Sequence, residues 1–307
     1  MAYAKFTPEM KKTYTILAPN MLPIHFHLLI RILEQFGYHV VLLESTSRTV
    51  VEEGLKNVHN DTCYPALLVV GQFMEALKSG KYDVDHTALL ITQTGGGCRA
   101  SNYIFLLRKA LEKAGYGNIP VLSLNFSGLE KGSGLPLTVP LLRKVIASIF
   151  YGDMLVALRS QTHAYENHRG DADAMTEKWI STIQGWIRDD KNYSAHDMKR
   201  RFYDIAADYA TIPITRVPKV KVGVVGEIYV KYSPLGNNDL EKFLESQDCE
   251  VNLPGLMGFV EYCVANYKLD IDLYCGNKLV AGGADAFLSW LDGIGCASYD
   301  AMRKYGF

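Results

Sequence analysis

Short apolar runs alternate with helix-like segments between residues 13 and 124, and this alternation limits the folds available to the chain. The predicted elements are strands at 13–18, 39–44, 87–92 and 120–124, and helices at 24–35, 66–77 and 101–114. Strands that alternate with helices form parallel sheets, because each helix carries the chain back to the starting edge. The pattern therefore predicts an α/β protein with a doubly wound parallel sheet, in which ligands bind outside the carboxyl ends of the strands.

Two cysteine motifs flank one of these helices and the strand that follows it. The first is Asn-Asp-Thr-Cys-Tyr-Pro at 60–65, and the second is Thr-Gln-Thr-Gly-Gly-Gly-Cys-Arg at 92–99. Both cysteines, Cys63 and Cys98, are predicted at helix N-termini, where the helix dipole and unpaired N–H groups favour a thiolate. A thiolate binds metal ions or attacks electrophiles, so the two motifs are the strongest candidates for chemistry. The alternative of two structural cysteines beside a tight turn stays open, because a free cysteine mostly packs as a small hydrophobe.

Residues at the predicted carboxyl ends of the strands extend this candidate site. Asn20, the stretch from Gln93 to Cys98, and Asn125 all fall there, and one crevice could collect them. The glycines Gly95, Gly96 and Gly97 remove side chains where the backbone must approach a bulky group or adopt a positive φ.

The composition is that of an ordinary globular protein, with 307 residues, a net charge of −1 and 48% hydrophobic residues. This length suffices for two domains, and the near-zero charge argues against nucleic acid or anionic membrane as a partner. The N-terminus has no apolar signal core, and no apolar run approaches the ~20 residues of a membrane span. Six cysteines are too sparse for a disulfide scaffold, so a cytoplasmic location with free or metal-bound thiols is predicted.

Three regions are predicted along the chain. They are an α/β cysteine-motif domain at 1–138, a helical connecting region at 139–217, and a second α/β domain at 218–307 that is expected to be incomplete. The predicted elements after residue 138 are helices at 141–151, 173–188, 196–209, 238–245, 257–265, 284–291 and 297–304, and strands at 219–227 and 250–253.

Other candidate sites are weaker. The segment from His163 to His168 could offer metal ligands, but its spacing is not that of a metalloprotease helix, and a solvated helix end or loop is the preferred interpretation. The remaining cysteines show no Cys-x-x-Cys pair of the kind that structural zinc sites use, and they are interpreted as core thiols. The chain also has no Walker-type loop.

Four sequence features resemble the 2-hydroxyacyl-CoA dehydratase-related family. They are the first cysteine motif, the second cysteine motif continued as Gln-Thr-Gly-Gly-Gly-Cys-Arg-Ala-Ser-Asn-Tyr at 93–103, Lys-Val-Gly-Val-Val-Gly-Glu-Ile-Tyr at 221–229, and the pair Asn237-Asn238. The similarity is to that family's branch of activase-related and double-cubane cluster proteins, and it corresponds to their N-terminal portion. The resemblance implies flavodoxin-like α/β domains that hold an oxygen-sensitive iron–sulfur cluster at their interface. It also implies that the chain accepts low-potential electrons from a partner ATPase. This partner is an activase of the Hsp70/actin/sugar-kinase fold, and it binds the ATP.

By the same resemblance, Cys63 and Cys98 are the metal ligands of a [4Fe-4S] or double-cubane cluster. The expected cofactor-binding residues around them are Thr62, Tyr64, Gly95, Gly96, Gly97, Arg99, Asn125 and Glu227. A four-iron cluster takes about four thiolates, and the cysteine motif expected further along such chains has no counterpart here. The chain is therefore expected to be a fragment, a half-protein, or a degenerate member of the family. A half-protein would be completed by a C-terminal segment or by a second chain, and a homodimer is one such arrangement.

The leading hypothesis is that the chain is an iron–sulfur redox component of an ATP-dependent reductase or dehydratase system. Two other functions compete with this hypothesis. In the first, the glycine run and helix N-termini bind an anion or the phosphates of CoA, and the protein is a non-catalytic assembly module. In the second, Cys63 and Cys98 form a redox disulfide, which needs Cα atoms within about 7 Å of each other.

Overall fold

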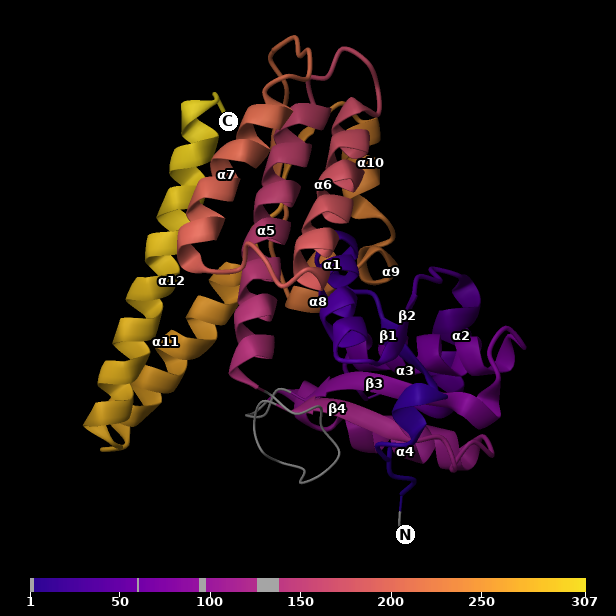
Figure 1. The fold of residues 1–307 in the computed structure, drawn as a ribbon. Coiled ribbons are helices and arrows are strands. Elements are labelled where there is room, and N and C mark those ends of the chain that lie inside the picture. Colours follow the sequence, from indigo (N-terminus) through magenta and orange to yellow (C-terminus); the bar gives the residue numbers. More distant parts are fainter. Residues whose placement is uncertain (1–2, 60, 94–97, 126–137) are drawn as a thin grey trace. The chain divides into compact units, whose positions relative to one another are not determined.

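The computed structural model describes residues 3–59, 61–93, 98–125 and 138–307, and the chain divides into two compact units (Figure 1). The first unit comprises Met1–Phe26, Ile30–Thr138 and Gly226–Leu240, and the second comprises His27–Leu29, Val139–Val225 and Glu241–Phe307. The segment Gly226–Leu240 therefore packs with the cysteine motifs, although it lies far from them in sequence. The domain boundaries drawn from the sequence stay a prediction.

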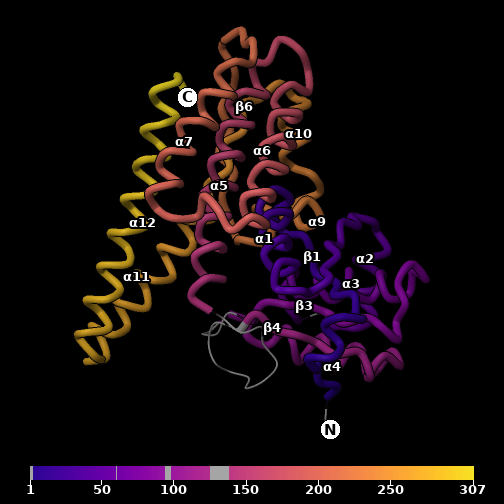
Figure 2. Tube along the Cα trace, in the orientation of Figure 1, coloured from indigo at the N-terminus to yellow at the C-terminus, as the bar shows by residue number. Residues whose placement is uncertain are grey.

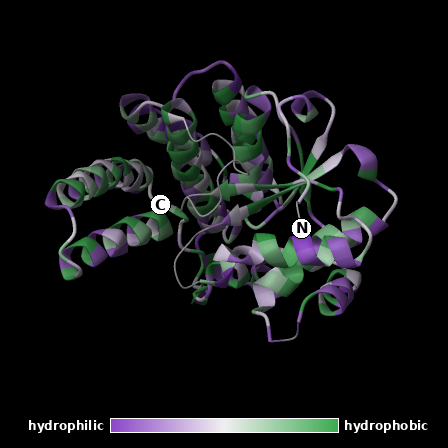
Figure 3. Ribbon diagram, turned by 90° about the horizontal axis from the view of Figure 1, so that it is seen from below, coloured by the Kyte–Doolittle hydropathy of each residue, from purple (hydrophilic) through white to green (hydrophobic). Residues whose placement is uncertain are grey.

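A four-stranded parallel sheet forms the centre of the first unit, with the strand order β2-β1-β3-β4. The strands are β1 (Thr15–Pro19), β2 (His39–Leu43), β3 (Thr87–Gln93) and β4 (Val121–Asn125). They consist mainly of hydrophobic residues, as Figure 3 shows, because a parallel sheet is covered on both faces. All four strands were predicted within two residues of these bounds, and the expected flavodoxin-like α/β fold is confirmed.

Helices cover the sheet and bury its two faces in separate apolar clusters. The helices of this unit are α1 (Pro23–Gln35), α2 (Arg48–Asn57), α3 (Tyr64–Lys78), α4 (Tyr103–Lys113), α8 (Ile228–Tyr232) and α9 (Pro234–Asn237), with short 3-10 turns η1 (Met10–Lys12), η2 (Val84–His86) and η3 (Arg99–Ser101). Alternate residues of each strand point to opposite faces. Thus Leu17 and Leu89 pack with α3 and α4, whereas Ile16 and Leu90 pack with Leu33 of α1.

Helix α2 was not predicted, because few of its residues are apolar. It is held instead by a close crossing with α3, where two glycines meet. A Cβ at Gly54 would overlap the carbonyl oxygen of Leu67, and a Cβ at Gly71 would overlap the carbonyl oxygen of Val50. The two helix backbones can approach this closely only because neither position carries a side chain.

The second unit is mainly helical, with long helices that lie beside one another (Figure 2). Its elements are α5 (Val139–His163), α6 (Asp171–Arg188), α7 (Ala195–Tyr209), β5 (Lys221–Gly223), α10 (Leu240–Ser246), β6 (Glu250–Asn252), α11 (Met257–Leu273) and α12 (Lys278–Lys304). Strands β5 and β6 form a two-stranded parallel pair. The separate helices predicted at 284–291 and 297–304 are one continuous helix, α12. None of the helices in the described ranges has an apolar stretch that could cross a membrane.

The crossing of α2 and α3 gives a stability prediction. Gly71→Ala should lower the free energy of unfolding by about 1–3 kcal/mol or more, because the new methyl group forces two packed backbones apart. Gly117→Ala is the matched control in the same unit, since its nearest contact would be an ordinary 3.8 Å from Glu112 Cα. Denaturant unfolding of both variants tests the prediction, and equal stabilities would contradict it.

Candidate functional site

Cys63 lies at the N-terminus of the most buried helix of the first unit. Cys63 is the N-cap residue of α3, and Pro65 occupies the first turn of that helix. The carbonyl oxygen of Cys63 accepts hydrogen bonds from the backbone N–H groups of Ala66 (3.1 Å) and Leu67 (3.3 Å). The thiol is half-buried and free. The predicted position at a helix N-terminus is therefore confirmed for Cys63.

Cys98 lies at a second N-terminus. It caps η3, and its sulfur accepts the backbone N–H of Ala100 at 3.5 Å. The residue is exposed and free. The helix predicted from residue 101 begins two residues later, because η3 intervenes and the N-cap residue of α4 is Asn102.

Tyr103, the first residue of α4, joins the two cysteine motifs. Its hydroxyl lies 2.9 Å from Cys63 Sγ, and only 8% of the residue is exposed. Burial raises the pKa of Tyr103 well above its ordinary value, and the charges of Cys63, Cys98 and Glu227 raise it further. Tyr103 ends the second motif at 93–103, but it was not among the predicted site residues.

The distant segment Gly226–Leu240 contributes two of the surrounding residues. Glu227 is the exposed N-cap residue of α8, and its carboxylate accepts the backbone N–H of Val230 at 3.0 Å. Tyr229 is buried, which raises its pKa to about 12, with smaller contributions from Tyr64 and Glu227. Tyr229 also packs in the apolar cluster that contains residues of α3. This packing holds the segment that carries Glu227 in the same apolar cluster against which Cys63 packs, across more than 160 positions of sequence.

The other predicted residues differ in where they lie. Thr62 precedes Cys63 in a turn closed by a 3.0 Å bond from its backbone N–H to the His59 carbonyl oxygen. Tyr64 is exposed, and Arg99 is exposed in η3 with no ion pair to another described residue. Asn125 ends β4, where its backbone pairs in register with Gln93. The predicted glycines Gly95, Gly96 and Gly97 lie outside the described residues.

Two amides hold the carboxyl edge of the sheet. Gln93 is fully buried and donates from Nε2 to the carbonyl oxygen of Ser101 at 3.0 Å, which ties the end of β3 to η3. Asn20 donates from Nδ2 to Glu44 Oε1 at 3.1 Å, which joins the ends of β1 and β2. The predicted location of both amides at the carboxyl ends is confirmed.

The thiols fit part of a cluster site. Thiolates are the ligands that iron–sulfur clusters use, and both cysteines are free and lie at helix N-termini. Within the described parts of the chain, no group of three or more His, Cys, Asp or Glu side chains is placed to hold a metal ion. Cys63 and Cys98 therefore suit two ligand positions and not a closed site.

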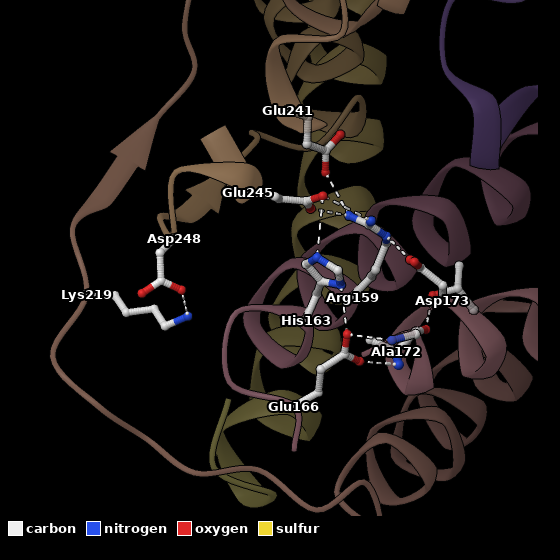
Figure 4. A network of polar contacts seen from close by, with 11 residues as sticks. Arg159, His163, Glu166, Ala172, Asp173, Lys219, Glu241, Glu245 and Asp248 are labelled. Carbon is white, nitrogen blue, oxygen red and sulfur yellow. Dashed lines mark hydrogen bonds and ion pairs between the residues drawn. The ribbon is translucent and has the colours of Figure 1, made fainter. Parts of the chain in front are cut away.

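A second polar cluster, which the sequence did not reveal, lies in the second unit around Arg159 of α5 (Figure 4). Arg159 Nε lies 2.6 Å from Asp173 Oδ1 of α6. Its Nη1 lies 3.1 Å from Glu241 Oε1 and 2.6 Å from Glu245 Oε1 of α10. One guanidinium thus links three helices through three carboxylates. We call these residues, with His163 and Glu166, the Arg159 cluster.

The prediction of a solvated helix end for His163 and Glu166 is wrong. Glu166 is almost fully buried and accepts the backbone N–H groups of Gly170 (2.8 Å) and Ala172 (2.7 Å) at the start of α6. His163 lies between two carboxylates, with Nδ1 3.0 Å from Glu166 Oε1 and Nε2 3.5 Å from Glu245 Oε2. Because Glu245 belongs to a distant helix, the local sequence could not reveal this burial.

A family model described as a CoA enzyme activase uncharacterised domain matches residues 21–86. This range contains α2 and α3 with Cys63, and it ends before Cys98. No curated protein and no solved structure matches the chain. The match supports a relationship to the dehydratase- and activase-related family, and it covers less than half of the chain.

The Arg159 cluster gives a prediction of pH dependence. Although 37% of the Glu241 side chain is exposed, burial raises its pKa above the ordinary 4.5, and the attraction of Arg159 opposes this only in part. A raised carboxyl pKa in the folded state means that stability is lost as the pH rises through that pKa. Glu241→Gln should remove this loss, so that the melting temperature falls less than that of the wild type from pH 4.5 towards neutrality.

Glu245→Gln is the matched variant for this measurement. Glu245 is the more buried partner of Arg159, and its two oxygens both face the guanidinium, so its neutralisation should destabilise the protein at neutral pH. If Glu241→Gln lowered the melting temperature at pH 7 as much as Glu245→Gln does, the assignment of Glu241 would be refuted.

Proposed function

We propose that this chain is a redox component in which Cys63 and Cys98 bind one iron–sulfur cluster. The observation that carries the proposal is the 2.9 Å contact between Cys63 Sγ and the hydroxyl of Tyr103, the first residue of the helix that follows Cys98. This contact joins the two segments that contain the free cysteines through one buried phenol, and two unrelated packing cysteines would not need such a link.

The residues of the chain have distinct roles in this proposal. The α3 N-terminus favours the Cys63 thiolate through its dipole, and the Ala100 N–H does the same for Cys98 as a hydrogen-bond donor. Arg99 is a nearby cation that would offset negative charge. A bound cluster supplies one-electron transfer at a potential set by its ligands, hydrogen bonds and exposure. We assign Thr62, Tyr64, Asn125, Glu227 and the glycines Gly95, Gly96 and Gly97 to the surroundings of the cluster.

The proposed partner is an ATP-dependent activase that delivers low-potential electrons to this chain. The match of residues 21–86 to an activase-associated domain supports this partner. The proposed ATP site lies on the partner, as the family resemblance implies. Since a four-iron cluster takes about four thiolates, the proposed remaining ligands come from a further segment or a second chain.

The proposal predicts that Cys63→Ala and Cys98→Ala each remove most of the iron and acid-labile sulfide from anaerobically purified protein. Cys98→Ala should cost less than about 1 kcal/mol of stability, because Cys98 is exposed. Cys63→Ala should cost about 1–3 kcal/mol, because it also removes the hydrogen-bond partner of the buried Tyr103 hydroxyl. Cys296→Ala is the control and should leave the iron content unchanged. Cys296 lies in the second unit and is exposed, so its interpretation as a core thiol was wrong.

Two outcomes would contradict the cluster assignment. One is a wild-type chain that stays free of iron under strict anaerobiosis, even with an added activase. The other is an iron content in both cysteine variants equal to that of Cys296→Ala. If CoA or phosphate instead bound equally to the wild type and to Cys98→Ser, an anion-binding module would replace the proposed redox function.

A further inference from the structure

The contact between Tyr103 and Cys63 links the two cysteine motifs directly. The phenol oxygen lies 2.9 Å from the sulfur, across 40 positions of sequence. The Tyr103 ring is held in the apolar cluster of the first unit together with Ile104 and Leu107 of the same helix. Among the described residues, the sulfur of Cys63 is the hydrogen-bond partner of this hydroxyl. The ring is therefore fixed in place, and its polar end is aimed at the sulfur.

We propose that Tyr103 is a positioning residue for Cys63. Its hydroxyl donates a hydrogen bond to the Cys63 thiolate, holds the sulfur in its ligating position and raises the reduction potential of the bound cluster. This inference rests on the proposed function and extends it to a residue that no motif assigns as a ligand.

The direction of the hydrogen bond follows from the chemistry of the two groups. A thiol and a phenol can each donate, but a thiolate has no proton and can only accept, so the phenol must be the donor once Cys63 is a ligand. A hydrogen bond to a ligand sulfur withdraws electron density and stabilises the more negative reduced state. Removal of that bond should therefore make reduction harder.

The environment of Cys98 provides an internal comparison. Its sulfur accepts from the backbone N–H of Ala100 at 3.5 Å, and no side-chain substitution at Ala100 other than proline removes that donor. The bond to Cys63 comes from a side-chain hydroxyl, and a phenylalanine at position 103 would remove it while preserving the ring. The hydrogen-bond donor to Cys63 can therefore be removed by a side-chain substitution, whereas the donor to Cys98 is a backbone group that such a substitution leaves in place.

The test compares Tyr103→Phe with the wild type after anaerobic purification. The iron content should stay close to that of the wild type, and the reduction potential should shift to a more negative value. Tyr116→Phe is the control, because Tyr116 packs on the same apolar cluster in the same unit. It should leave both quantities unchanged. An unchanged potential in Tyr103→Phe at full iron loading would overturn the proposal.

A measurement on the iron-free protein separates this inference from the proposed function. With carbon-13 at the hydroxyl-bearing ring carbon of tyrosine, a slowly exchanging hydroxyl gives separate signals in mixed light and heavy water. Tyr103 should show this splitting, and Cys63→Ala should abolish it. A wild-type chain without iron would refute the cluster, while the splitting would still uphold the hydrogen bond. A Tyr103 signal that Cys63→Ala does not alter would refute the hydrogen bond, even if iron were bound.

Discussion

The close crossing of α2 and α3 is the constraint on which the candidate site depends. Helix α3 is buried from Pro65 to Leu77 except at Glu75, so its position is set by packing on every side. Gly54 and Gly71 allow α2 to lie against it with backbone contacts in place of side chains. Because α3 cannot shift, the N-cap residue Cys63 is held at a fixed point beside Tyr103. The geometry at the thiol is thus a consequence of core packing.

The two units differ in their buried polar groups: the second unit contains ion pairs, whereas the surroundings of the cysteines contain mainly uncharged groups. In the second unit, Arg159 meets several carboxylates, and the burial of Glu241 raises its pKa despite that cation. Such a cluster ties α5, α6 and α10 together, but each buried charge also carries a desolvation cost. Around Cys63 and Cys98, by contrast, helix N-termini and a phenol provide polarity without a buried ion pair among the described residues. Groups of this kind stabilise a thiolate while leaving its sulfur free to bind a metal.

The strands and most helices could be predicted because their signals are local. A strand such as His39–Leu43 or Thr87–Gln93 is an apolar run with a clear beginning and end. Helix α2 escaped prediction because its stability comes from a backbone crossing, and the interruption expected within α12 does not occur. The local sequence pattern predicts which face of a helix or strand is hydrophobic, but it does not predict which other element packs against that face.

The candidate site was predictable in part for the same reason. The helix N-terminal positions of Cys63 and Cys98 follow from neighbouring residues such as Pro65. The role of Tyr103 depends on a contact across 40 positions, and the approach of Glu227 depends on the packing of a segment from much later in the chain. The burial of His163 likewise comes from a distant carboxylate. Tertiary contacts of this kind leave no local signal in a single sequence.

The Mössbauer spectrum of the anaerobically purified chain, grown on isotope-enriched iron, tests most directly whether Cys63 and Cys98 hold one cluster. The wild type should show the signal of a protein-bound four-iron cluster, and the double variant Cys63→Ala/Cys98→Ala should show none. The absence of bound iron from the wild type, or an identical cluster signal in the double variant, would contradict the account.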